Sequence, residues 1–235
     1  MKLEAQIGVA KVARYATHES GDTFEIIERP QGGLSAVLVD GQRSGRSAKI
    51  ISNIVARKAI SLLGEGVRDG AVARAAHDYL RTHRSGQVSA ELQVVSVDLR
   101  TRTIVISRNS HCPAWIIQKG QLQLFDAPSQ PIGIYPNTKP VILELPLESG
   151  TYVAVYTDGL TLAGNGTDHQ PDLKGILCCG ASKSMIAQGL ADKLLESALQ
   201  AEQGHSKDDM SVLVVALLPT ESHSRIRRFS ASFPL

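Results

Sequence analysis

Acidic residues stand at the ends of apolar, strand-like runs in three parts of this 235-residue chain. Asp40 and Asp158 come at or just after the end of such a run, Asp208 comes shortly before a third, and Asp22 lies nearer the start. A carboxylate at the end of a buried strand costs free energy unless something positive meets it. If folding brings these strand ends together, the four carboxylates repel and raise one another's pKa values. Hard divalent cations relieve that repulsion, because they prefer oxygen ligands.

Two Mg²⁺ or Mn²⁺ ions held this way would have a defined chemistry. Ions roughly 3.5–4 Å apart share a bridging water and lower its pKa, which makes a nucleophile suited to a phosphate ester. They also neutralise the phosphoryl oxygens as charge develops. Gly41 and Gly159 follow two of the aspartates, where a glycine lets the backbone turn sharply and offer a carbonyl to the ion. Taken alone, however, each Asp-Gly after a strand is more often a turn than a ligand.

The pattern of apolar residues predicts the elements that must position these carboxylates. Helices are expected at 44–63, 69–84 and 182–202, the last with Met185, Ile186, Leu190, Leu194 and Leu195 inside. Strands are expected at 4–16, 24–28, 34–39, 90–99, 103–107, 115–118, 121–125, 141–145, 152–156 and 211–218. The order of strands, two helices, strands, helix and strand indicates an α+β fold with antiparallel sheet.

Composition excludes several classes of protein. The formal charge of +2 gives no strong field for nucleic acid or an anionic membrane, and the 4% aromatic content argues against a base-stacking surface. No apolar run is long enough to span a membrane, and the N-terminus lacks a signal-peptide core, so a cytoplasmic protein is expected. Cys112, Cys178 and Cys179 form neither a zinc pattern nor a disulfide framework.

Six short segments stand in order along the chain: Ser20–Phe24, Val39–Ala48, Asn109–Pro113, Gln130–Ile134, Tyr156–Thr161 and Lys207–Val212. Together they resemble the protein phosphatase 2C (PP2C) family of metal-dependent serine/threonine phosphatases. The branch they resemble most contains the sporulation stage II protein E phosphatase and the phosphatases of stress-response sigma-factor circuits. Individually the segments are weak signals, but their order and spacing agree with that family over about residues 5 to 218.

The resemblance implies a four-layer αββα sandwich, with two central antiparallel sheets flanked by helices and metals at one end of the sheets. It implies that Asp40 bridges two Mn²⁺ or Mg²⁺ ions, that the Gly41 carbonyl binds one of them, that Asp158 and Asp208 complete one ion and that Asp22 serves the second. Asp209 is implied either to orient a ligand or to bind a third, looser ion. Catalysis then depends on Asp40 and Asp158 through the water that the metals activate.

Other residues have competing interpretations. Arg43 and Arg46 follow the second acidic segment, where they either contact the substrate phosphate or are exposed charges at the start of a helix. Arg14 is too distant from Asp22 to be matched to the arginine that eukaryotic members use. His18 and His205 are candidate proton donors, although a loop histidine without that role is the favoured interpretation.

His111-Cys112 raises the alternative of a cysteine phosphatase. That mechanism needs an arginine six residues after the cysteine, where this chain has Gln118, and the intervening residues favour a strand. We therefore reject it and interpret His111 as a structural turn residue.

From these residues and the resemblance we expect a metal-dependent phosphatase. It would hydrolyse phosphoserine or phosphothreonine on a bacterial signalling regulator. A regulator of a stress or sigma-factor pathway, such as an anti-sigma-antagonist domain, is the substrate that the resemblance implies. The alternatives are a non-catalytic pseudophosphatase that binds a regulator and a small-molecule phosphomonoesterase.

The catalytic domain is expected over residues 1–220. Residues 221–235, with basic Arg225, Arg227 and Arg228, are expected to form a flexible tail.

Overall fold

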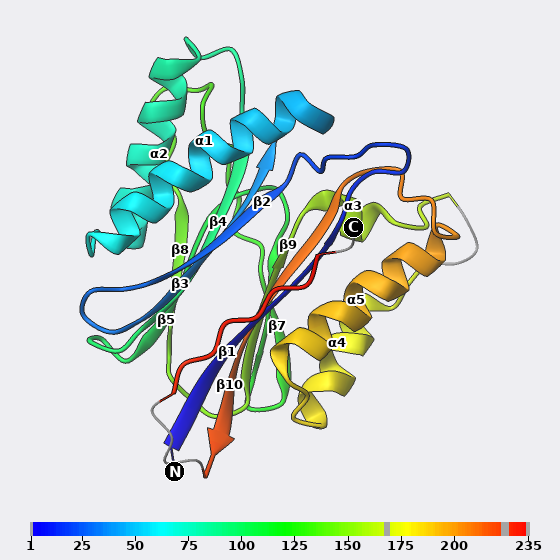
Figure 1. Cartoon of the computed structure of the whole chain (residues 1–235). Helices are drawn as coiled ribbons and strands as arrows, with labels where there is room; N and C mark the ends of the chain where they lie inside the picture. The colour runs from blue at the N-terminus through cyan, green and yellow to red at the C-terminus, as the bar shows by residue number, and fades with distance from the viewer. Residues whose placement is uncertain (1, 167–169, 222–225, 234–235) are drawn as a thin grey trace.

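Two antiparallel sheets of five strands each lie face to face, and helices cover both outer sides (Figure 1). The computed structural model describes residues 2–166, 170–221 and 226–233. The first sheet has the order β1 (Lys2–Val12), β10 (Met210–Thr220), β9 (Thr151–Tyr156), β6 (Ala114–Gln118) and β7 (Gln121–Phe125). The second has the order β2 (Thr23–Glu28), β3 (Gly33–Gly41), β4 (Ala90–Asp98), β5 (Thr103–Asn109) and β8 (Val141–Pro146). The helices are α1 (Gly45–Gly64), α2 (Asp69–His83), α3 (Asp158–Leu162), α4 (Leu173–Ser182) and α5 (Ala187–Ala201).

The alternation of side chains along the strands creates three apolar layers. In β3, Leu38 faces the other sheet while Val37 and Val39 face α1 and α2. In β10, Leu213 lies in the layer between the sheets and Val214 packs in the layer that includes α5. Both faces of the central strands are therefore buried, which confirms the predicted four-layer sandwich.

One end of the sandwich gathers the strand termini that carry the acidic residues. Val12 at the end of β1 pairs with Met210 at the start of β10. Thr23 at the start of β2 pairs with Val39 near the end of β3. Tyr156, the last residue of β9, pairs with Val212 of β10. The topology thus brings segments from distant parts of the sequence to one edge, as the metal hypothesis requires.

Two expected elements differ from the structure. The first strand ends at Val12 instead of residue 16, and Ala16 has a φ of 65° in the following turn. The helix expected over 182–202 is present as α5, but it starts later, at Ala187, because Ser184 has a φ of 50° in the turn after α4, a helix that was not expected and that ends at Ser182. A left-handed residue stops a helix, and the chain reverses there so that α4 and α5 pack side by side. Ile186, expected inside, is 57% exposed.

A buried ion pair fixes the turn between α1 and α2 to the second sheet. Arg29 Nη1 lies 3.0 Å from Asp69 Oδ2, and both side chains are about 6% exposed. The same guanidinium donates to the hydroxyls of Ser35 and Ser96 and to the carbonyl of Val67. Ser96 also donates to Asp69. Both buried charges are therefore hydrogen-bonded as well as paired, which offsets part of the free energy lost when they leave water.

Outside the sandwich, the described part of the tail is exposed. Arg227 contacts Glu28 at the end of β2, and Arg228 is also exposed. Arg225 lies outside the described residues, and the flexibility of residues 221–235 stays a prediction. Within the described ranges, none of the helices combines the length and the apolar character that crossing a membrane requires.

Candidate metal and phosphate site

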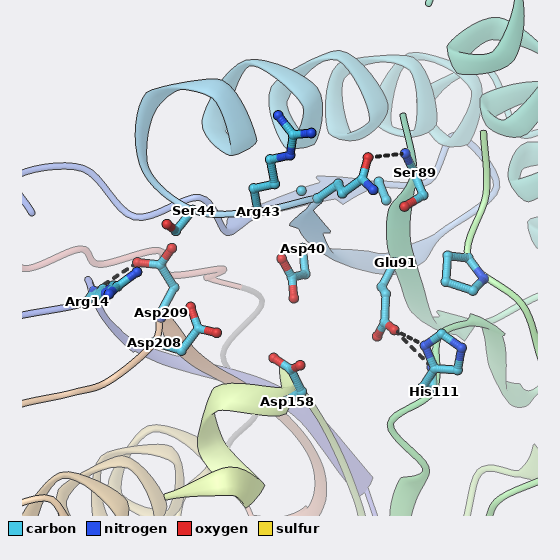
Figure 2. A pocket seen from close by; sticks show the side chains of 14 residues that line it. Arg14, Asp40, Arg43, Ser44, Ser89, Glu91, His111, Asp158, Asp208 and Asp209 are labelled. Atoms are coloured by element: carbon cyan, nitrogen blue, oxygen red, sulfur yellow. Dashed lines mark hydrogen bonds and ion pairs between the residues drawn. The ribbon is translucent and has the colours of Figure 1, made fainter. Parts of the chain in front are cut away.

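The predicted carboxylates line a cavity of about 440 Å³ at the gathered end of the sandwich. Asp40 comes from the end of β3, Asp158 from the start of α3, and Asp208 from the loop before β10. Figure 2 shows these three carboxylates directed toward one shared space. Gly41 and Asp209 also belong to the wall. The structure therefore brings together five of the six predicted ligand residues.

The glycines after two of these aspartates are there because backbone packs against them. A Cβ on Gly41 would lie 2.1 Å from the carbonyl oxygen of Ala48, in the first turns of α1. A Cβ on Gly159 would lie 2.2 Å from the carbonyl oxygen of Asp209. Any other residue would force these segments apart. Gly159 thus lets the α3 start and the Asp208 loop approach closely enough to share a site.

The cavity concentrates negative charge in a partly buried position. Burial raises the pKa of Asp40 to about 9, and the carboxylates of Asp22, Asp158, Glu91 and Asp208 add to the shift. The pKa of Asp158 is also raised, chiefly by burial and then by Asp208 and Glu91. The clustered charges oppose one another's ionisation, which is the condition that a bound cation relieves.

Asp22 lies at the same end of the sandwich but does not line the cavity within the described part of the chain. Its Oδ2 accepts hydrogen bonds from Ser211 Oγ at 2.6 Å and from Thr157 Oγ1 at 3.0 Å. Its Oδ1 is buried without a hydrogen-bond partner. Burial raises the pKa of Asp22 to about 6, and Asp209 adds to the rise while the two hydroxyls oppose it. One oxygen is thus anchored and the other unsatisfied, and ligation of the second ion by Asp22 stays a prediction.

Asp209 has a clear structural task. Its Oδ1 accepts the backbone N–H of Arg14 at 2.9 Å, and its Oδ2 accepts that of Gly21 at 2.8 Å. The side chain therefore holds the segment between β1 and β2 against the loop that carries Asp208. This arrangement favours the orienting role over the third-ion role for Asp209.

Sequence reasoning missed two charged residues in the wall, Glu91 and Arg14. Glu91 pairs directly with Asp40 across β3 and β4, so the two side chains share a face. In the sequence, Glu91 is a charge near the start of a largely apolar strand, and nothing else distinguishes it. Arg14, set aside on spacing alone, reaches the wall because Asp209 holds its backbone.

The other candidate residues from the sequence differ in whether they line the cavity. Arg43 lines the cavity, whereas Arg46 is not in the described wall. In Figure 2 the Arg43 side chain points away from the three carboxylates. His18 and His205 are likewise absent from the described wall, but His111 is part of it, so its interpretation as a mere turn residue was incomplete. Cys112 is buried, and burial raises the pKa of its thiol, which opposes a thiolate nucleophile.

The residues present fit a hard divalent cation. The three directed carboxylates supply oxygen donors, and in the described structure no Lys, Arg or His forms an ion pair with them. No group of three His, Cys, Asp or Glu side chains within the described ranges is close enough to hold one ion directly. Mg²⁺ usually keeps several waters and binds proteins through one or two carboxylates, so waters would complete the coordination of an ion held here.

The raised pKa values predict how the metal-free protein responds to pH. Between the ordinary carboxyl pKa of 3.8 and the raised value of about 9 for Asp40, the folded state binds more protons than the unfolded state. Stability in chelator should therefore fall as pH rises through this window. Urea denaturation at about pH 5 and about pH 9 measures the change, and Asp40→Asn should reduce it. Greater metal-free stability at the higher pH would contradict the assignment.

Comparison with known proteins agrees with this geometry. A family model described as stage II sporulation protein E (SpoIIE) matches residues 30–218. Stage II sporulation protein E of Bacillus subtilis (strain 168) is 22% identical over 215 residues, which are 89% of this chain and 25% of that protein. The protein of the same name from Priestia megaterium is 20% identical over 212 residues, again 89% of this chain and 36% of the relative. This chain thus spans only about a quarter to a third of these curated relatives.

Solved structures show the same fold. The PP2C phosphatase domain of SpoIIE from Bacillus subtilis, solved with a fragment of its regulatory domain, superposes with a TM-score of 0.76 at 21% identity, over 91% of this chain and 63% of that one. The catalytic domain of the serine/threonine protein phosphatase PstP, in complex with two manganese ions, gives 0.68 at 15% identity, over 93% and 100% of the two chains. The fold is that of PP2C phosphatases, and since the family model covers most of the sequence, the chain belongs to the stage II sporulation protein E (SpoIIE) family.

Proposed function

We propose that this chain is a metal-dependent protein phosphatase that hydrolyses phosphoserine and phosphothreonine. The observation that carries the proposal is the convergence of Asp40, Asp158 and Asp208, without ion-pair partners in the described structure, on one cavity. Membership of a family whose solved relatives include PP2C phosphatases supports it. A pseudophosphatase would be expected to lack a ligand aspartate, whereas the acidic segments of this chain each contain one.

Asp40, Asp158 and Asp208 would hold Mn²⁺ or Mg²⁺, and Asp209 would keep the Asp208 loop in place. When bound, the ions would neutralise the phosphoryl oxygens and lower the pKa of the attacking water. By holding the ions, the carboxylates would also fix the position of the phosphoryl group relative to that water, which removes much of the entropic cost of the reaction. Two ions are proposed, and Asp40 would supply ligand oxygens to them.

The cavity favours a protein substrate over a small metabolite. Arg14, Arg43 and His111 line it from different sides and are all exposed to solvent, so the cavity is open to solvent and not enclosed (Figure 2). A site for a small ligand normally encloses most of its surface. The substrate we propose is a phosphorylated bacterial signalling regulator of a stress or sigma-factor pathway, such as an anti-sigma-antagonist domain. We also propose that the chain acts in the cytoplasm, where it would meet such a regulator.

Hydrolysis of para-nitrophenyl phosphate and of a phosphoserine peptide, each with Mn²⁺, with Mg²⁺ and with chelator, tests the proposal. We expect turnover of both substrates with metal and none with chelator. Turnover of small phosphorylated metabolites with no action on any phosphopeptide or phosphoprotein would favour the phosphomonoesterase. A folded sample that hydrolyses neither substrate with any metal would favour the binding module.

Arg43 and Arg46 offer a matched pair for the substrate's negative charge. Arg43→Met should raise KM for a phosphopeptide by roughly 3- to 10-fold with little change in kcat, up to about 1.4 kcal/mol of binding, because Arg43 alone of the two lines the cavity. Arg46→Met should leave both constants unchanged. Steady-state kinetics of the two variants checks this, and equal effects would contradict the assignment of Arg43.

A further inference from the structure

The cavity wall contains a histidine–carboxylate pair that the metal site does not use. His111 Nδ1 lies 2.6 Å from Glu91 Oε1, and the backbone N–H of His111 donates to the same oxygen at 3.2 Å. Glu91 Oε2 accepts the hydroxyl of Ser110 at 2.5 Å. The carboxylate of Glu91 is thus occupied by three donors from one loop, which suits a positioning role better than direct ligation.

Hydrogen bonds from buried side chains fix the loop that carries His111. The fully buried guanidinium of Arg108 donates to the carbonyls of Ser110 at 2.6 Å and Cys112 at 3.0 Å. Asn109 donates to the carbonyls of Gln130 and Lys139. Burying a cation costs free energy unless it is hydrogen-bonded, and here carbonyl oxygens of the loop accept those hydrogen bonds. The result is a side chain whose position is set before any substrate arrives.

The ring of His111 is exposed to solvent although Nδ1 is bound to Glu91. Its side chain is 70% exposed, whereas that of Glu91 is 17% exposed. Because Nδ1 is engaged by Glu91, Nε2 is the ring nitrogen left to exchange a proton with another molecule, and it makes no hydrogen bond within the described structure. Figure 2 shows the ring at the edge of the cavity, with Glu91 between it and the aspartates.

We propose that His111 is the proton donor to the departing seryl or threonyl oxygen, and that Glu91 positions it; this inference rests on the proposed function. A serine alkoxide leaves poorly without a proton, so a general acid on the leaving-group side speeds the reaction. The aspartates occupy the side of the cavity where the phosphoryl group would be held. His111 lies beyond Glu91 and is exposed, so it faces solvent from which the peptide part of a substrate can approach (Figure 2).

The step balances without any further reactant. A water oxygen forms a bond to phosphorus while the bond from phosphorus to the substrate oxygen breaks. The electron pair of the broken bond stays on the substrate oxygen, which takes the proton from His111 Nε2. The attacking water gives up one proton to solvent, and His111 regains one from solvent. Glu91 accepts the Nδ1 hydrogen bond throughout.

Two substrates that differ in their need for a proton test the proposal. Para-nitrophenolate is stable enough to leave unprotonated, whereas a serine side chain is not. With Mn²⁺, His111→Gln should lower kcat/KM for a phosphoserine peptide by roughly 10²- to 10³-fold, but by no more than about threefold for para-nitrophenyl phosphate. Glu91→Gln should lower the ratio of peptide to para-nitrophenyl phosphate activity in the same direction, by roughly 5- to 30-fold.

His205→Gln is the matched control, because His205 stacks edge-on against Tyr15 and is not in the described wall. It should leave both activities within about twofold of wild type. If His111→Gln lowers both activities equally, or lowers neither, while the wild type is active, His111 is not the proton donor and the proposed function stands. A wild type that hydrolyses neither substrate overturns the proposed function and the proton donor with it.

Discussion

Replacing Asp40 by asparagine should reduce Mn²⁺-dependent hydrolysis by at least about 10³-fold in kcat/KM, equivalent to about 4 kcal/mol of transition-state stabilisation. Burial raises the pKa of Asp40, and the carboxylates of Asp22, Asp158, Glu91 and Asp208 add to the rise. Asp40 is also a residue proposed to supply ligand oxygens to the ions. Asparagine keeps the volume and removes the charge that would hold them.

The same variant should be folded, and in chelator it should be more thermally stable than wild type. The reason is that asparagine removes one member of a repelling cluster without opening a void. In excess Mn²⁺ the order should reverse, because only the wild type gains stability from binding. Asp78→Asn, on an exposed position of α2, is the control and should change neither activity nor metal response. Full Mn²⁺-dependent activity in Asp40→Asn would show that the assigned site is wrong.

The largest effect on stability should come from Asp69→Ala, at the opposite end of the second sheet. The substitution leaves the guanidinium of Arg29 buried without its carboxylate partner. Removing one member of a buried pair typically costs about 3–5 kcal/mol, because an uncompensated charge remains. The free energy of unfolding, from urea denaturation with an unchanged m-value, measures it.

Two further variants separate the ion pair from the general effect of substitution. Arg29→Met combined with Asp69→Ala should cost less than the sum of the single changes, since neither charge is then left alone. Glu148→Ala, which breaks the exposed pair with Lys119 at 3.5 Å, should cost under about 1 kcal/mol. Equal costs for Asp69→Ala and Glu148→Ala would contradict the role of the buried network.

Much of the fold could be predicted because the strands follow simple rules. The hairpin of β2 and β3 could be placed from its Gly-Gly turn and flanking apolar runs, and the start of α2 from Asp69. The helix α4 and the start of α5 could not, because the turn between them depends on a left-handed Ser184 and on packing between the two helices. Leu190 and Leu194 of the single helix expected there are still buried, so the pattern recognised the face and misplaced the ends.

Some residues of the site could be predicted from the sequence and others could not. Asp40, Asp158 and Asp208 could be found because each carboxylate adjoins an apolar strand and a short motif. Glu91 could not, because it reaches the cavity only through the pairing of β4 with β3, a long-range contact that local pattern does not encode. The segment that contains His111 could be recognised in the sequence. Its contact with Glu91, which distinguishes it from a turn residue, exists only in the folded chain.

Anomalous X-ray scattering from crystals grown with Mn²⁺ would locate the proposed ions directly. We expect manganese peaks inside the cavity bounded by Asp40, Asp158 and Asp208, and their loss from crystals of Asp40→Asn. We also expect Glu91 to keep its hydrogen bonds to Ser110 and His111 and not to become a ligand. A well-ordered cavity without a peak at saturating Mn²⁺, or peaks only elsewhere on the chain, would contradict the metal site proposed for this protein.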